Sequence, residues 1–124
     1  MTVSLWCVLV AAILPILCTG IAKWGFRDFD NRNPRDWLAR QQGWRARAHA
    51  AQGNSWEAFA IFSAGVFAAH LAKGPQQTID AIAVAFIVSR LLFILFYVTD
   101  RSSLRSSVWA VGMGLSVALF VVSA

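Results

Sequence analysis

Four long apolar runs constrain this chain more than any other feature of its sequence. They occupy residues 3–22, 56–72, 79–99 and 108–124 of a chain of 124 residues. A helix needs about 20 apolar residues to cross the hydrocarbon core of a bilayer, and each run is close to that length. The chain is 58% hydrophobic and only 14% charged, whereas about a quarter of an average soluble chain is charged. The sequence therefore predicts an all-α integral membrane protein, with residues 1–124 forming one domain, a four-helix bundle in contact with the lipid bilayer.

Basic side chains concentrate between the first two runs. Seven of the eleven Lys and Arg residues lie within residues 23–47, together with three aspartates. The third loop adds Arg101 and Arg105, whereas the second has only Lys73. Cytoplasmic loops carry an excess of Lys and Arg, so we expect the first and third loops in the cytoplasm and both termini in the periplasm of a bacterial inner membrane. This placement accounts for the net charge of +5, and we expect no nucleic-acid partner.

Local signals predict where the second helix begins and ends. Pro34 ends any helix that precedes it, and from Asp36 onwards the composition suits a helix. We therefore expect the second helix to begin in the cytoplasm, near Trp37 or Trp44, and to end before Pro75. Three glycines within the runs are small enough to allow close helix packing: Gly65, Gly112 and Gly114.

Two ionisable side chains stand out within the apolar runs, Glu57 and Arg90. A charge at the bilayer centre costs a few kcal/mol unless it is paired or hydrated. One interpretation is a buried Glu57–Arg90 ion pair that holds the bundle together. The other is a binding pocket, because nearby polar groups supply more donors than one ion pair consumes. Arginines with a single carboxylate suit a small zwitterionic, net-anionic ligand. The additional polar groups are Asn54, Tyr97, Arg101 and Arg105.

The remaining reactive side chains predict no second site. Cys7 and Cys18 lie on one helix face but about 16 Å apart along the axis, too far for a disulfide, and we expect them to be buried as small apolar residues. His70 stands alone near the far end of the second run, where an interfacial position explains it. We find no metal-ligand spacing, glycine-rich phosphate loop or nucleophile elbow.

Three stretches resemble a single family, the membrane-associated proteins in eicosanoid and glutathione metabolism. They are RAHAAQGNSWEAF at residues 47–59, the Arg-x6-Tyr pattern from Arg90 to Tyr97, and RSSLRSSVW at residues 101–109. That family includes microsomal glutathione transferase, leukotriene C synthase and microsomal prostaglandin E synthase, and the resemblance covers nearly the whole chain. It implies a homotrimer in which glutathione, as co-substrate, binds between subunits near the cytoplasmic face. A lipophilic small molecule would arrive from the bilayer.

The resemblance also implies roles for individual residues. The catalytic residue would be Arg105, whose guanidinium lowers the pKa of the glutathione thiol. The glutathione-binding residues would be Asn54, Glu57, Arg90, Tyr97, Arg101 and Arg47. The implied activity is conjugation of glutathione to lipophilic substrates, or reduction of peroxides by it. The alternative is a non-catalytic structural or accessory subunit of a larger membrane assembly with other membrane subunits, because Ala50 stands where related enzymes carry an arginine. A transporter is disfavoured, since no broken helix is apparent.

Overall fold

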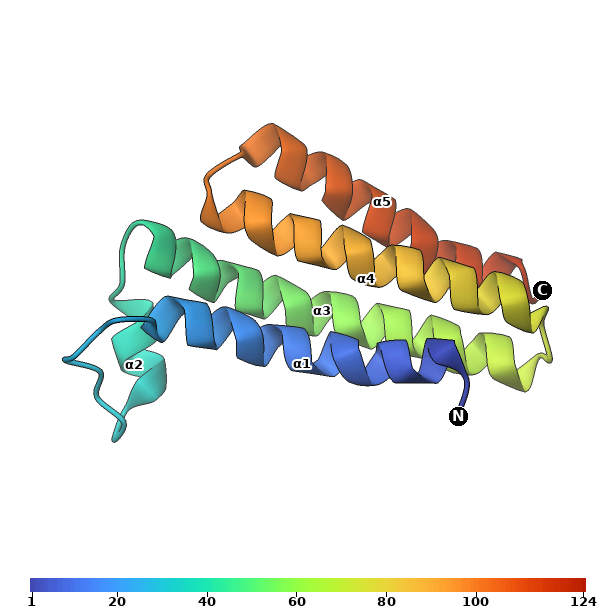
Figure 1. The fold of residues 1–124 in the computed structure, drawn as a ribbon, viewed down its shortest axis with the longest axis horizontal. Coiled ribbons are helices and arrows are strands. Elements are labelled where there is room, and N and C mark those ends of the chain that lie inside the picture. Colours follow the sequence, from blue (N-terminus) through green and yellow to red (C-terminus); the bar gives the residue numbers. More distant parts are fainter.

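The computed structural model describes residues 1–124 as five helices without a strand. The prediction of an all-α protein is therefore confirmed. Four long helices lie alongside one another, and a short one packs at one end (Figure 1). The N- and C-termini lie at the opposite end, beside the turn between α3 and α4 (Figure 1). The elements are α1 (Val3–Lys23), α2 (Pro34–Ala39), α3 (Trp44–Leu71), α4 (Gln76–Val98) and α5 (Ser102–Val121).

Three of these helices are long and apolar enough to cross a membrane: α1, α4 and α5. They support three of the four predicted spans. The fourth, residues 56–72, falls within the second half of α3, which is the longest helix at 28 residues. Helix α3 is not among the candidate spans, because Asn54, Glu57 and His70 interrupt its apolar sequence. The protein is thus an integral membrane protein, and the crossing of the bilayer by α3 stays a prediction.

The boundaries of α3 follow its turn residues. The helix begins at Trp44, one of the two predicted starts. The other predicted start, near Trp37, is wrong, because Trp37 lies in the separate helix α2, which ends at Ala39. The chain then turns through Gly43 with φ of +63°, a left-handed conformation that glycine adopts without steric cost. At the other end, α3 stops before Pro75, as expected, and Pro75 serves as the N-cap of α4.

The core extends along the helices as a series of aromatic and small-residue contacts. Phe62 of α3 stacks on Phe86 of α4 with ring centroids 4.0 Å apart. Cys7 from α1 and Leu119 from α5 belong to the same cluster, and Cys18 belongs to the next. Both cysteines are buried and unpaired, as expected.

Two of the three glycines mark close helix contacts. A Cβ on Gly65 would lie 3.1 Å from the Cβ of Leu119 and 3.1 Å from the carbonyl oxygen of Ser116, so α3 and α5 nearly touch there. A Cβ on Gly112 would lie 3.0 Å from the Ser89 hydroxyl of α4. Gly114 has no such neighbour within 4 Å. The close-packing prediction is confirmed for Gly65 and Gly112 and wrong for Gly114.

We expect Gly65→Val to destabilise the fold by about 1–3 kcal/mol, the usual cost of inserting methyl groups into a filled contact. The matched control is Gly114→Val, which places the same side chain in open space. Unfolding of the detergent-solubilised protein by heat or denaturant measures both changes. Equal losses of stability for the two variants would contradict a tight contact between α3 and α5.

A polar cluster at the end with the termini involves a charge that sequence interpretation did not single out. Asp80 of α4 accepts a hydrogen bond from the backbone N–H of Ser4 at 2.8 Å and another from Gln76 Nε2 at 2.7 Å. His70 bonds the Thr2 hydroxyl at 3.0 Å through Nε2 and the Val66 carbonyl oxygen at 2.8 Å through Nδ1. A carboxylate at the N-terminus of α1 also complements the helix dipole. These contacts fasten the start of α1 to α3 and α4.

Candidate functional site

Two adjoining cavities open between α3, α4 and α5, in the part of the protein where the sequence places its candidate residues. We call them the inner cavity, of about 110 Å³, and the outer cavity, of about 250 Å³. They share Asn54 and Trp109. The inner cavity is lined by Asn54, Glu57, Ala58, Ile61, Phe86, Arg90, Trp109, Gly112, Met113 and Ser116. The outer cavity is lined by Asn54, Phe93, Tyr97, Arg105, Ser106 and Trp109.

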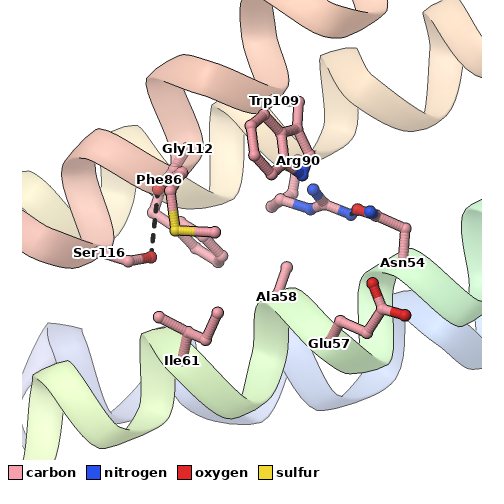
Figure 2. Close-up of a pocket in the computed structure, with 10 residues that line it drawn as sticks. Asn54, Glu57, Ala58, Ile61, Phe86, Arg90, Trp109, Gly112 and Ser116 are labelled. Atoms are coloured by element: carbon pink, nitrogen blue, oxygen red, sulfur yellow. Dashed lines mark hydrogen bonds between the residues drawn. The ribbon is translucent and has the colours of Figure 1, made fainter.

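One face of α3 forms a wall of the inner cavity. Asn54, Glu57 and Ile61 recur at helical spacing, and Figure 2 shows their side chains on the cavity side of the helix, with Ala58 between them. Residues three and four positions apart share one face of a helix, so these side chains form a stripe along α3. The stripe is polar at Asn54 and Glu57 and apolar at Ile61, so the cavity has a polar and an apolar end.

Arg90 crosses from α4 to the polar end of this wall. Its side chain is buried, with 3% of the residue exposed. Nη2 donates to Asn54 Oδ1 at 2.8 Å and to Ser55 Oγ at 3.3 Å, and the guanidinium lies 4.1 Å from the Phe93 ring centroid. Its Nε–H has no acceptor. Neutral groups therefore orient Arg90 and leave it able to donate further.

Glu57 does not pair with Arg90. The structure contains one ion pair, between Arg40 and Asp36 at 3.0 Å, so no cation lies within 4.0 Å of the Glu57 carboxylate. Glu57 is exposed in the single chain, although it lines the same cavity as Arg90 (Figure 2). The ion-pair interpretation is thus wrong for this structure, because Arg90 takes amide and hydroxyl partners instead.

We expect Glu57→Gln to leave the fold intact, with a change in stability within about 0.5 kcal/mol, because no salt bridge is lost. A buried Glu57–Arg90 pair would instead make this change cost about 3–5 kcal/mol. Thermal unfolding together with size-exclusion chromatography in detergent distinguishes the two results. Loss of the folded or assembled protein in Glu57→Gln would instead show that Glu57 has a structural role.

Arg105 and Tyr97 form the cationic part of the outer cavity. Tyr97 lies in the last turn of α4 and Arg105 in the first turn of α5. The chain reverses between them at Asp100, which has a φ of +62°. The guanidinium carbon of Arg105 lies 4.4 Å from the Tyr97 ring centroid. Phe93 packs edge-on against the Tyr97 ring, with the two ring centroids 5.5 Å apart. A ring thus positions the Arg105 cation beside the cavity.

Two predicted binding residues line neither cavity. Arg47 donates from Nε and Nη2 to the carbonyl oxygen of Val98, at 3.2 and 3.1 Å, and so caps the end of α4. Arg101 is exposed at the N-cap of α5. Helix α4 ends at Val98, so Arg101 does not share a helix with Arg90 and Tyr97. The structure therefore brings together five of the seven candidates: Asn54, Glu57, Arg90, Tyr97 and Arg105.

Two residues of the site escaped sequence interpretation. Ser55 helps to orient Arg90, but it lies on the neighbouring face of α3 and so falls outside the 3/4 stripe. Trp109 lines both cavities. It could have been identified from the sequence, because it lies four residues after Arg105 and so shares a helix face with it.

Comparison with known families gives one match. Residues 3–124 match the sequence model of the MAPEG family, essentially the whole chain. Neither the curated proteins nor the solved structures contain a match.

Proposed function

Because the chain belongs to the MAPEG family, we propose that this membrane protein is a glutathione-dependent transferase or peroxidase for lipophilic substrates. The observation that carries the proposal is the outer cavity, where Arg105 lies against Tyr97 beside Asn54. A cation held at the edge of this cavity suits an anionic ligand group that takes part in the reaction. A glutathione thiolate is such an anion.

Glutathione offers groups that match the candidate side chains. It carries two carboxylates, one ammonium group and a thiol. Glu57 would accept from the ammonium group, and the unsatisfied Nε–H of Arg90 would donate to a carboxylate. Asn54 lines both cavities and would contact the peptide part between these ends. Tyr97 would lie near the thiol.

Arg105 would supply the chemistry. A free thiol has a pKa of about 8.5, so only a small fraction is ionised at neutral pH. A guanidinium beside the sulfur favours the thiolate, with the proton released to solvent. The thiolate then attacks an electrophilic carbon of the lipophilic substrate, a C–S bond forms, and the leaving group departs with its electron pair.

A homotrimer in the bacterial inner membrane completes the proposal. Glu57 is exposed on the single chain, and an exposed carboxylate within a membrane needs protein or water beside it. A neighbouring subunit would cover this side of α3. Arg47 and Arg101, which line neither cavity of one chain, would then contribute to the ligand only at the subunit boundary.

We expect the first and third loops to face the cytoplasm, because they carry most of the basic residues. Alkaline phosphatase, which folds in the periplasm, should be active when fused after Ala124 and inactive when fused within the first loop, after Arg32. Activity only of the fusion at Arg32 would reverse the orientation and place the proposed glutathione site on the periplasmic side.

Calorimetric titration of the detergent-purified protein with glutathione tests the proposal directly. We expect saturable binding, together with conjugation of a reactive aryl halide when both substrates are present. S-methylglutathione serves as a control, because it retains the carboxylates and the ammonium group but has no ionisable thiol. Absence of both heat and conjugation at saturating glutathione would contradict the proposal.

A non-catalytic accessory subunit is the second candidate function. Ala50 stands where related enzymes carry an arginine, and the nearest replacement, Arg47, is held by the Val98 carbonyl oxygen. Binding of glutathione without conjugation or peroxide reduction would favour this role, in which the cavity stabilises an assembly with other membrane subunits.

A further inference from the structure

A third cavity lies away from the candidate site, along α1. It has a volume of about 370 Å³ and is lined by Leu17, Gly20, Ile21 and Trp24. These residues follow 3/4 spacing and so share one face of the helix. A Cβ added at Gly20 would meet no atom within 4 Å, so the space beside this residue is open. The last two turns of α1 therefore carry an apolar groove.

Arg45 is fixed at the same end of α1. Its Nη1 donates to the carbonyl oxygen of Ala22 at 2.8 Å, in the turn of α1 that also lines the groove. The guanidinium carbon lies 4.1 Å from the Phe26 ring centroid and 4.2 Å from the Trp44 ring centroid. Two aromatic rings and a carbonyl oxygen thus hold a cation at the end of α1, with other N–H groups of the guanidinium free to donate.

Lys23 adds a second cation at the same end of α1. It is the last residue of α1, and its Nζ lies 4.1 Å from the Phe29 ring centroid. Neither Lys23 nor Arg45 has a carboxylate within 4.0 Å, since the one ion pair joins Arg40 to Asp36. Two positioned cations without a carboxylate partner therefore lie at the end of α1 that carries the groove.

We propose that this groove binds an anionic phospholipid. One acyl chain lies across Gly20, and the phosphate meets Lys23 and Arg45. Helix α1 is long and apolar enough to span the membrane, so the groove faces the acyl region and its basic end meets the headgroups. Trp24, which is 78% exposed, has the amphipathic ring that is enriched at this interface. Positive side chains near a membrane surface attract anionic lipids, and the fixed cations make that attraction local.

This site is independent of the proposed glutathione site, because the two share no residue. A bound lipid would link the end of α1 to the start of α3, since Arg45 belongs to α3 and contacts the Ala22 carbonyl oxygen. Failure of glutathione to bind would leave the lipid proposal unaffected, and the converse also holds.

The test compares phosphatidylglycerol with phosphatidylcholine of identical acyl chains, titrated into the full-length protein in detergent micelles. Native mass spectrometry counts the retained lipid, and thermal unfolding reports its stabilising effect. We expect one phosphatidylglycerol per chain, bound about tenfold more tightly than phosphatidylcholine. Gly20→Leu fills the groove and should weaken the retention of both lipids. The control Gly114→Leu, which also places leucine in open space, should leave retention unchanged.

Charge variants locate the headgroup. Lys23→Gln and Arg45→Gln should each reduce the preference for phosphatidylglycerol severalfold. If Arg45→Gln does not fold because it loses the contact with Ala22, Lys23→Gln alone tests the prediction. The combined change of three exposed arginines, Arg27, Arg32 and Arg35 to Gln, should preserve the preference. Equal binding of both lipids to the wild type, or a preference lost only in the triple variant, would overturn the proposal. So would a change of oligomeric state in Gly20→Leu, because a second copy of the chain would then cover the groove.

Discussion

Arg105→Ala should abolish the ultraviolet absorbance of bound glutathione thiolate and reduce turnover by about two orders of magnitude. The guanidinium at the outer cavity is the one cation that contacts Tyr97 there, and its loss returns the thiol to its ordinary, largely protonated state at neutral pH. A positioned charge of this kind is worth about 10²–10³ in rate when it acts on a developing anion. Difference spectroscopy with saturating glutathione measures the thiolate, and conjugation of an aryl halide measures turnover.

The affinity for glutathione should change little in the same variant, because Arg105 acts on the sulfur end of the ligand alone. Arg40→Ala is the control, since it removes an exposed arginine of α2 that pairs only with Asp36 and lines neither cavity. It should retain the thiolate absorbance. Retention of the absorbance in Arg105→Ala, or its loss in Arg40→Ala, would show that Arg105 is not the group that stabilises the thiolate.

Arg90→Met should weaken glutathione binding by about 10- to 100-fold, the range expected when a hydrogen bond to a charged group worth about 1.5–3 kcal/mol is lost. Methionine retains much of the length of the arginine side chain without its charge. The change removes the unsatisfied Nε–H that would meet a ligand carboxylate. It also removes the two hydrogen bonds that reach Asn54 and Ser55. Calorimetric titration gives the affinity.

Arg40→Met is the control for this prediction, because Arg40 is exposed and pairs only with Asp36 on the surface of α2. Its affinity for glutathione should match the wild type within about twofold, since exposed ion pairs contribute little. An unchanged affinity in Arg90→Met would show that Arg90 serves the packing of α3 against α4 and not the ligand.

Local sequence features predicted the helices and much of one wall of the site. The apolar runs gave α1, α4 and α5 to within a few residues, except that α5 begins at Ser102, six residues before the run at 108–124. Trp44 and Pro75 bounded α3 as expected. The spacing of Asn54, Glu57 and Ile61 predicted their shared face because a helix repeats every 3.6 residues, whatever surrounds it.

Tertiary structure decided which partners the polar side chains take. Arg90 bonds Asn54 and Ser55 instead of Glu57, and Arg47 caps a carbonyl oxygen 51 residues away instead of entering a cavity. Those outcomes depend on the rotation and depth of one helix against another, which helical periodicity leaves open. The close approach at Gly65 and the open space at Gly114 have the same cause. The sequence by itself determined which residues share a helix face, whereas the packing of α3, α4 and α5 determined which of those faces enclose a site, because contacts between helices are fixed only when the side chains of both interlock.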